Sequence, residues 1–360
     1  MENVVNMKPD FYRGKRVFIT GNTGFKGLWL TEILTLFGAD ITGYSLPSTP
    51  EGSRLFDELK MKDKINAVTG DVRDFDALSK AMKEAKPEIV FHLAAQPLVI
   101  ESYRDPIGTY MTNVVGTLNL LESVRQGNTV KSFVNVTTDK VYKNMEWVWS
   151  YREDEPLDGF DPYSNSKSCS ELVTHSYDNS FLREMGIAVS TARAGNVIGG
   201  GDFSANRIIP DCIRAACDHS VIGVRNPSST RPYQHVLEPL FAYLMIAQGQ
   251  YEDLYRSGWY NVGPDDCDCV TTGELANIFC KLWGEGQTWK SVPTEGPHEA
   301  NFLKLDSAKI KSVFGWKPRW HIEDAVEQTI LWAKAWERKE NISVVMEEQI
   351  YKFVNEGELE

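Results

Sequence analysis

The sequence has no apolar run of about eighteen residues, the length that a transmembrane helix requires. It has little cysteine, six scattered residues in 360, which argues against a disulfide framework and favours free thiols in a reducing cytoplasm. It is also short of positive charge: 38 lysines and arginines stand against 50 aspartates and glutamates, a formal net charge of −12. A polymeric nucleic acid would need an excess of cations. We therefore expect a cytoplasmic protein that binds neither membranes nor nucleic acid. The N-terminal segment agrees, because it lacks the apolar core of a signal peptide.

Internal repeats, low-complexity tracts and zinc-binding cysteine patterns are absent as well. Cys267 and Cys269 stand close together, but no second pair at zinc spacing accompanies them, so we expect no metal. What is present, 42% hydrophobic and 24% charged residues, is the composition of an ordinary globular protein.

Short apolar segments alternate with amphipathic ones over the first half of the chain. Strands are expected at residues 16–20, 39–44, 88–95, 132–137 and 187–193, with helices between them, for example at 28–37 and 75–84. Strands joined by crossovers of this length are parallel, with helices on both faces of the sheet. The pattern predicts an α/β protein with a doubly wound parallel sheet of the Rossmann type, which binds ligands at the carboxyl ends of its strands.

A glycine-rich turn joins the first expected strand to the first expected helix, in the sequence Thr20-Gly-Asn-Thr-Gly-Phe-Lys-Gly27. Gly21 permits the tight turn, Gly24 lets a pyrophosphate approach the backbone, and Gly27 allows the helix to pack closely on the strand. Glycines would fit any tight turn, but their place at the first strand–helix junction favours a dinucleotide. The GxxGxxG spacing is typical of short-chain dehydrogenases.

The end of the second expected strand lacks the carboxylate that usually binds the adenosine ribose of NAD. Ser45 stands there instead, and it either hydrogen-bonds the ribose or is an ordinary loop serine. NAD is favoured over NADP because no arginine cluster awaits a 2′-phosphate; Arg54 is the nearest. Asp71 is placed to contact adenine, or else it caps the helix that follows.

Glycine and proline become frequent after residue 196 and divide the chain into short pieces. We expect residues 1–195 to form the NAD-binding Rossmann domain and residues 196–360 to form a smaller, substrate-binding lobe. Within that lobe, residues 232–262 are expected to return and pack on the first domain.

Tyr163-Ser-Asn-Ser-Lys167 carries the strongest catalytic signal. At positions i and i+4 of a helix, the Tyr163 phenol and the Lys167 ammonium share one face. A tyrosine with a pKa near 10 is a poor base at neutral pH, and we expect the lysine, helped by a positively charged nicotinamide, to lower that pKa. Lys167 can also hydrogen-bond the nicotinamide ribose. The alternative, a surface pair, is hard to reconcile with a glycine turn about 140 residues upstream.

Three further polar residues, Thr138, Asp139 and Lys140, end the strand that is expected beside the nicotinamide. Thr138 offers a hydroxyl to the reacting alcohol. Reversible oxidation needs only one acid/base group, so the titratable Asp139 and Lys140 indicate a second chemical step that moves more protons. The alternative is an Asp–Lys turn in solvent.

The order of these motifs resembles that of the nucleotide-sugar 4,6-dehydratases of the extended short-chain dehydrogenase family, over nearly the whole chain. The segments that carry the resemblance are TGNTGFKG, FHLAAQPLV, NVTTDKVY, DPYSNSK, RAGNVIGGGD, RPYQHV and PHEANFLKLD. The GFKG, AAQPLV, TTDK, RAGNVIGGGD and PHEA segments look specifically like the branch that acts on CDP-glucose.

The resemblance implies which residues bind each ligand. Those expected to contact NAD are Gly21, Asn22, Thr23, Gly24, Phe25, Gly27, Ser45, Asp71, Val72, Leu93, Ala94, Ala95, Thr137, Tyr163 and Lys167. Those expected to face the sugar nucleotide are Gln96, Asn196, Arg207, Arg231, Tyr233 and His298. Arg231 is the best candidate for the diphosphate, because a guanidinium fork matches its oxygens, with a structural ion pair as the alternative. The family also implies a homodimer or homotetramer, formed through helices that include the one bearing Tyr163.

The chain departs from its relatives at two positions. The dTDP-glucose branch carries Asp-Glu where this chain has Asp139-Lys140, and that glutamate is the C5 base of the branch. Lys140 as a neutral amine, or a neighbouring group, must serve here instead. Asn22 replaces a histidine common in the CDP branch, a change that we expect to be tolerated.

The resemblance implies an internal redox cycle on the sugar. Tyr163, assisted by Thr138, removes the C4 hydroxyl proton as the C4 hydride passes to NAD. Lys140 or a neighbour removes the C5 proton, and Asp139 protonates the departing C6 hydroxyl. The hydride then returns to C6. The alternatives are a dehydratase of dTDP- or GDP-hexoses, a nucleotide-sugar 4-epimerase, which has no need for Asp139, and a non-enzymatic NAD-sensing protein, which would be expected to lose Tyr163 or Lys167.

Overall fold

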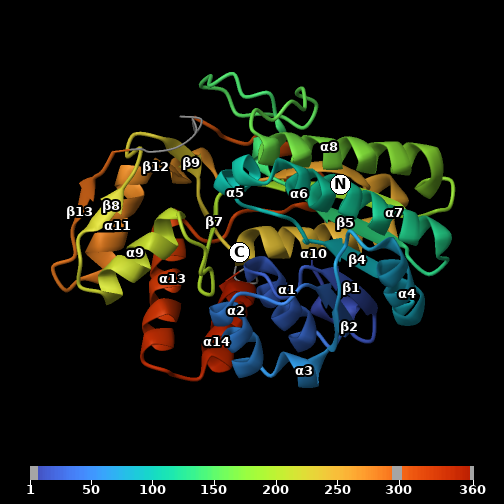
Figure 1. Cartoon of the computed structure of the whole chain (residues 1–360), viewed down its shortest axis with the longest axis horizontal. Helices are drawn as coiled ribbons and strands as arrows, with labels where there is room; N and C mark the ends of the chain where they lie inside the picture. Colours follow the sequence, from blue (N-terminus) through green and yellow to red (C-terminus); the bar gives the residue numbers. More distant parts are fainter. Residues whose placement is uncertain (1–6, 294–301, 357–360) are drawn as a thin grey trace.

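The computed structural model describes residues 7–293 and 302–356. Its centre is a sheet of seven parallel strands in the order β11-β6-β5-β4-β1-β2-β3 (Figure 1). The strands are β1 (Arg16–Thr20), β2 (Asp40–Ser45), β3 (Asn66–Thr69), β4 (Ile89–His92), β5 (Ser132–Val136), β6 (Ala188–Ala194) and β11 (Gly258–Val262). The direction of winding reverses between β1 and β4, where this kind of sheet binds its ligands. The predicted doubly wound parallel sheet is confirmed.

The strands are short apolar segments because helices cover both faces of the sheet. β4, β5 and β6 are buried at every position. The five expected strands lie within a few residues of their predicted bounds. β3 was not expected: it is an edge strand with mostly exposed residues, so it shows neither an apolar run nor a clear alternation.

Two layers of helices enclose the sheet (Figure 1). On one face, α1 (Phe25–Leu36) and α10 (Leu237–Glu252) share the main hydrophobic core. α10 is buried along almost its whole length, as a helix that is apolar on all sides must be. On the other face lie α4 (Phe75–Ala85), α7 (Gly116–Gln126) and α8 (Pro162–Tyr177).

A smaller lobe with its own hydrophobic core lies at the carboxyl ends of the strands (Figure 1). Its helices are α9 (Ile208–Cys217), α11 (Thr272–Trp283) and α13 (Ile322–Glu337). Short strand pairs complete it: β9 (Thr230–Pro232) with β12 (Cys269–Thr271), β8 (Ile222–Val224) with β13 (Trp289–Ser291), and β7 (Val197–Ile198) with β10 (Gln234–His235).

The chain crosses back to the sheet more than once. α10 and β11 do so within residues 232–262, the expected return. A second return, which the boundary prediction did not include, is α14 (Ile342–Glu356): its Phe353 ring lies 4.9 Å from the Phe241 ring of α10, centroid to centroid. In the described part of the chain, no helix combines the length and apolar character that a membrane crossing requires.

Candidate active site

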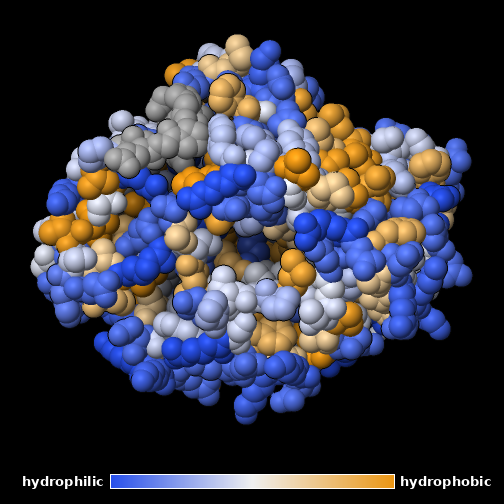
Figure 2. All heavy atoms as spheres, viewed as in Figure 1, coloured by the Kyte–Doolittle hydropathy of each residue, from blue (hydrophilic) through white to orange (hydrophobic). Residues whose placement is uncertain are grey.

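A cavity of about 930 Å³ opens between the carboxyl ends of the strands and the smaller lobe. Figure 2 shows a hollow near the middle of the surface that faces the viewer. Its size is at the upper end of the range for small-molecule sites. Of the described residues predicted to bind ligands or to act in catalysis, all line it except Asn22 and Gln96.

The glycine turn before α1 is required by close backbone contacts. Gly21 has φ +77°, and a Cβ there would lie 2.7 Å from the backbone nitrogen of Ala94. A Cβ on Gly27 would lie 2.1 Å from the carbonyl oxygen of Gly21. Gly24 has ordinary room, caps α1 without a side-chain hydrogen bond and borders the cavity. The uncapped N-terminus of α1 therefore faces the cavity, an arrangement that fits a pyrophosphate.

Asn22 and Ser45 brace this turn. The Ser45 hydroxyl donates to the side-chain oxygen of the buried Asn22 and accepts the backbone N–H of Thr23, at 3.3 Å. The single hydroxyl proton of Ser45 is thereby used within the turn, while Ser45 still lines the cavity. These contacts give Ser45 a structural role, and its role as a ribose ligand stays a prediction. Asn22 is buried and is not among the residues that line the cavity.

Asp71 is held by its neighbour Arg73. Its carboxylate accepts the Arg73 backbone N–H at 2.9 Å and pairs with the Arg73 guanidinium, whose hydrogen bonds lower the pKa of Asp71. Asp74, not Asp71, caps α4, because its side chain accepts the Ala77 N–H at 3.0 Å. The alternative role of Asp71 as a helix cap is therefore wrong.

One predicted substrate ligand, Gln96, is not among the residues that line the cavity. The Gln96 amide donates to Thr109 Oγ1 at 2.9 Å and accepts the Leu98 N–H at 2.6 Å, so it shapes its own loop. His298 lies outside the described residues.

Tyr163 and Lys167 stand on α8, which begins at Pro162 with Asp161 as its cap: the Asp161 side chain accepts the Ser164 N–H at 2.9 Å. Both side chains are buried and line the cavity. Burial raises the pKa of Tyr163 to about 12, against hydrogen bonding with Thr138 and the charge of Arg207, which lower it.

Lys167 was expected to lower the pKa of the Tyr163 phenol. Within the protein alone, the groups that lower this pKa are Thr138 and Arg207. Burial lowers the pKa of Lys167 to about 8, and its ammonium donates to the Val136 carbonyl at 3.2 Å. The lysine is thus tied to the end of β5 and is itself poorly solvated, and Arg207 is the cation that lowers the pKa of the phenol.

A buried ion pair behind the cavity fixes α8 against the sheet. Glu171 of α8 pairs with Arg193 of β6 at 2.9 Å and accepts the hydroxyl protons of Thr137 and Thr191. Thr137, predicted to line the cofactor, borders the cavity while its hydroxyl donates to Glu171.

Asp139 is a buried acid at the end of β5. Its Oδ1 accepts the Thr138 hydroxyl at 3.0 Å, and its Oδ2 is buried with no hydrogen-bond partner in the described part of the chain. Burial raises the pKa of Asp139, against the charges of Lys140 and Arg231. The solvent-exposed turn, the alternative for Asp139, is excluded by this burial.

Cations line the opposite, lobe side of the cavity. Arg231 on β9 is buried, and its charge reaches Asp139. Arg207 pairs with Asp202 at 3.0 Å, and Tyr233 lies within 3.2 Å of the Thr272 hydroxyl. Asn196 lines the cavity between β6 and β7.

Comparison with known proteins places the chain in a family. The family model described as GDP-mannose 4,6 dehydratase matches residues 18–329. The chain belongs to this family. The predicted resemblance to nucleotide-sugar 4,6-dehydratases is thereby confirmed.

A curated relative of the chain is a dehydratase, and solved structures that share its fold include both dehydratases and epimerases. It is 45% identical over 353 residues to a CDP-glucose 4,6-dehydratase of Salmonella typhimurium, covering 96% of this chain and 98% of that protein. A solved dTDP-glucose 4,6-dehydratase of Bacillus anthracis, in complex with NAD, has a TM-score of 0.75 at 21% identity, covering 91% of this chain and 99% of the other. A UDP-glucuronic acid 4-epimerase from Bacillus cereus has a TM-score of 0.76 at 19% identity, covering 89% and 99%.

One residue that lines the cavity, Lys26, was not predicted from the sequence as a site residue. It lines the cavity from the first turn of α1, and burial lowers its pKa to about 7. A cation is disfavoured at a helix N-terminus by the helix dipole, and this was the signal available in the sequence.

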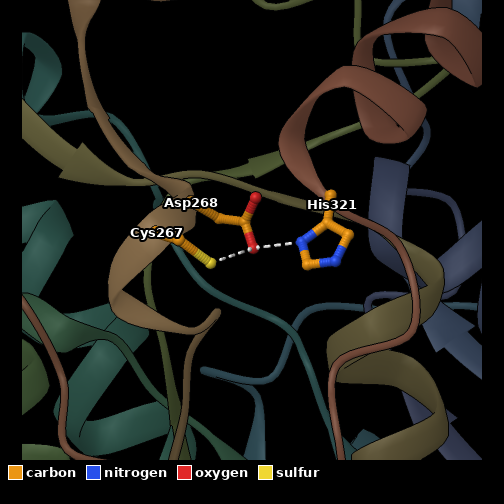
Figure 3. A group of neighbouring side chains, drawn as sticks. All are labelled: Cys267, Asp268 and His321. Carbon is orange, nitrogen blue, oxygen red and sulfur yellow. Dashed lines mark hydrogen bonds and ion pairs between the residues drawn. The ribbon is translucent and has the colours of Figure 1, made fainter.

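Outside the cavity, one group of potential metal ligands gathers among the described residues: Cys267, Asp268 and His321, whose ligand atoms lie within 4.8 Å of one another (Figure 3). Asp268 accepts the Ile322 backbone N–H at 2.9 Å and pairs with His321 Nδ1 at 2.9 Å. The carboxylate thus joins the loop before β12 to the start of α13, a structural role that requires no metal.

Proposed function

We propose that the chain is an NAD-dependent CDP-glucose 4,6-dehydratase, a hydro-lyase that forms CDP-4-keto-6-deoxy-glucose for deoxysugar biosynthesis. The observation that carries this proposal is the buried Asp139 carboxyl, with one unpartnered oxygen in the described part of the chain, beside Thr138 and Tyr163. The 45% identity to a CDP-glucose 4,6-dehydratase, over nearly the full length of both chains, supports the choice of reaction and nucleotide.

NAD fits the part of the cavity formed by the glycine turn and the ends of β1, β2 and β4. Its pyrophosphate would lie at the N-terminus of α1. The residues proposed to hold it are Gly21, Thr23, Gly24, Phe25, Gly27, Asp71, Val72, Leu93, Ala94, Ala95, Tyr163 and Lys167. When bound, NAD supplies an acceptor that takes one hydride from the sugar and gives it back within the same turnover.

Tyr163 is proposed to accept the proton of the sugar C4 hydroxyl on its phenolic oxygen. Thr138, which hydrogen-bonds the phenol, would hold the same hydroxyl in line. A phenol with a pKa of about 12 is too weakly acidic to ionise readily at neutral pH, so the nearby cations must favour its phenolate. Arg207 contributes to this in the chain itself.

Asp139 is proposed to donate a proton to the C6 hydroxyl oxygen as the C6–O bond breaks and water leaves. Burial favours the protonated carboxyl that this step requires. Lys140, which lines the cavity beside Asp139, is the proposed base for the C5 proton, and it returns a proton to C5 after reduction at C6.

The rival functions make less use of this arrangement. A 4-epimerase needs Tyr163 and Lys167 but has no task for a buried acid at position 139. A protein that only senses NAD needs neither side chain. Dehydratases of dTDP- or GDP-hexoses would use all of these groups, so the nucleotide is decided by assaying each substrate.

The reaction itself can be tested with labelled substrate. CDP-glucose carrying deuterium at C4 is expected to yield product with deuterium at C6 of the same molecule, because one hydride moves within a closed site. In deuterated water, unlabelled substrate is expected to gain deuterium at C5, where an acid/base group exchanges its proton. Mass spectrometry and NMR of the product locate each label.

Each rival would place the label elsewhere. An epimerase returns the label to C4 and leaves C5 unexchanged, whereas a simple dehydrogenase releases it into free NADH. Either distribution would rule out the dehydratase.

Arg231 is proposed to bind the substrate diphosphate. In Arg231→Ala, substrate affinity is expected to fall on the order of a hundredfold, the usual effect of losing a charge-assisted pair, while NAD affinity changes little. Arg231→Lys keeps the positive charge but lacks the planar guanidinium fork, so its substrate affinity should lie between those of the wild type and Arg231→Ala. Calorimetric titration with CDP-glucose and with NAD measures both affinities. Unchanged substrate affinity in Arg231→Ala would assign Arg231 to structure.

We also propose a cytoplasmic homodimer or homotetramer. Ile107 of α6 (Pro106–Tyr110) and Leu172 of α8 are 76% and 53% exposed, on two helices that contact each other. These apolar side chains support assembly through α8. The six cysteines, all unpaired, agree with a reducing compartment.

A further inference from the structure

The Lys26 side chain belongs to the cavity and not to the outer surface of α1. Side chains in the first turn of a helix are tilted toward its N-terminus, and the N-terminus of α1 faces the cavity. The Lys26 ammonium lies 6.0 Å from the centre of the Tyr243 ring on α10.

Charged groups from four other segments act on this ammonium. Arg207, before α9, and Lys167 of α8 disfavour the protonated amine, whereas Asp139, after β5, and Asp202, after β7, favour it. In residues 7–293 and 302–356, no carboxylate lies close enough to Lys26 to form an ion pair, and the phenols of Tyr163 and Tyr243 are uncharged at neutral pH because burial raises the pKa of both. Among the described residues, Lys26 therefore has no ion-pair partner that would neutralise its charge.

Lys26 lies at the end of the cavity where hydride transfer is proposed. Its electrostatic partners Lys167 and Asp139 belong to that end, which also holds Tyr163. The opposite end, proposed for adenosine, is formed by Ser45 and Asp71 after β2 and β3.

We propose that Lys26 is a positioning residue for the redox step: its positive charge favours the reduced over the oxidised form of the bound nicotinamide. This inference rests on the proposed function, because it presupposes NAD in the cavity. An oxidised nicotinamide carries a positive charge and a reduced one does not, so a nearby cation repels only the oxidised form. Lys26 thereby makes the site a better hydride acceptor for the oxidation at C4.

The test is a binding measurement on the whole protein without sugar. The dissociation constants of NAD⁺ and NADH are determined by fluorescence or calorimetric titration for the wild type, Lys26→Met and Lys26→Arg. Methionine keeps most of the side-chain length without the charge, and arginine keeps the charge at every accessible pH. Lys26→Met should lower the ratio of the NAD⁺ to the NADH dissociation constant by roughly tenfold. Lys26→Arg should leave the ratio close to that of the wild type.

A pH series gives a second measurement that needs no variant. Because the pKa of Lys26 is about 7, its charge is present at lower pH and lost as the pH rises through neutrality. The same ratio in the wild type should therefore fall as the pH rises through neutrality, and this part of the change should be missing in both variants. A change that persists in all three proteins above neutrality belongs to Lys167, whose pKa is about 8.

The outcomes separate this inference from the proposed function. Equal ratios in the wild type and Lys26→Met, with both forms bound, would overturn the role of Lys26 and leave the dehydratase intact. A wild-type protein that binds neither form would overturn the proposed function. If Lys26→Met does not fold, as judged by circular dichroism, the wild type is compared with Lys26→Arg. A ratio that falls through neutrality in the wild type but not in Lys26→Arg supports the inference, and equal pH profiles overturn it.

Discussion

Tyr163→Phe is expected to reduce turnover of CDP-glucose by about a thousandfold, within the usual contribution of a positioned proton acceptor. The substitution removes one oxygen and keeps the ring, so α8 and the cavity wall retain their packing. The substitution removes the hydrogen bond between the phenol and Thr138, and with it the group that accepts the C4 hydroxyl proton. Substrate binding is assigned mainly to Arg231 and its neighbours. Steady-state rates and calorimetric titration with CDP-glucose separate the two effects: the rate should collapse while the affinity stays within a few fold.

Tyr243→Phe is the matched control. Tyr243 is also a buried tyrosine, on α10, and its hydroxyl has no hydrogen-bond partner among the described residues. Its removal should leave turnover near the wild-type value. If Tyr163→Phe also keeps turnover within tenfold of the wild type, Tyr163 is not the proton acceptor at C4.

Asp139→Asn is expected to separate the oxidation from the elimination. Asparagine preserves the shape of the side chain but has no carboxyl proton to give to the C6 oxygen. Oxidation at C4 uses Tyr163 and Thr138 and should survive, so enzyme-bound reduced cofactor should accumulate in the first turnover. Dehydrated product should form about a hundredfold to ten-thousandfold more slowly. Rapid-mixing absorbance of the reduced nicotinamide and product analysis follow the two steps.

Asp202→Asn controls for the loss of a buried negative charge in the same cavity. Asp202 is buried and pairs with Arg207, at 3.0 Å. Its substitution should alter both steps together or neither. Product formation at the normal rate in Asp139→Asn, with no accumulation of reduced cofactor, would contradict the role of Asp139 as the acid.

The sequence predicts the parts of the fold that depend on local pattern. β1, β4, β5 and β6 are apolar runs between turns, and their order along the chain dictates a parallel sheet. β3 is missed because an exposed edge strand carries little pattern. The second return of the chain through α14 is missed because amphipathic residues do not specify which surface they will cover.

The candidate site is predictable where the backbone fixes a residue at a strand end or on a helix face. Gly21, Gly27, Tyr163 and Lys167 line the cavity for this reason. The direction of a side chain is less predictable. Asn22 lies buried behind the glycine turn, where its side-chain oxygen accepts the hydroxyl of Ser45 from the end of β2.

The same limit applies to protonation. A lysine four residues from a tyrosine suggests a lowered phenol pKa, but burial, which depends on the whole fold, raises it to about 12. The position of Lys26 inside the cavity likewise follows from the N-terminus of α1 meeting residues of α8 and β5.

The late position of β11 in the chain bears on how the protein is made. β11 pairs with β6 along the edge of the central sheet, and α10 covers the sheet from just before it in the sequence. A ribosome that has released only the first 195 residues has therefore exposed six strands, but neither α10, which shares with α1 the burial of one face, nor β11, which pairs with the open edge of β6. At a synthesis rate of about 5–20 residues per second, several seconds pass before these elements emerge. During that interval the nascent chain exposes an apolar sheet face and an unpaired strand edge, both of which can aggregate with other chains. We therefore expect chaperones to bind the chain at this stage.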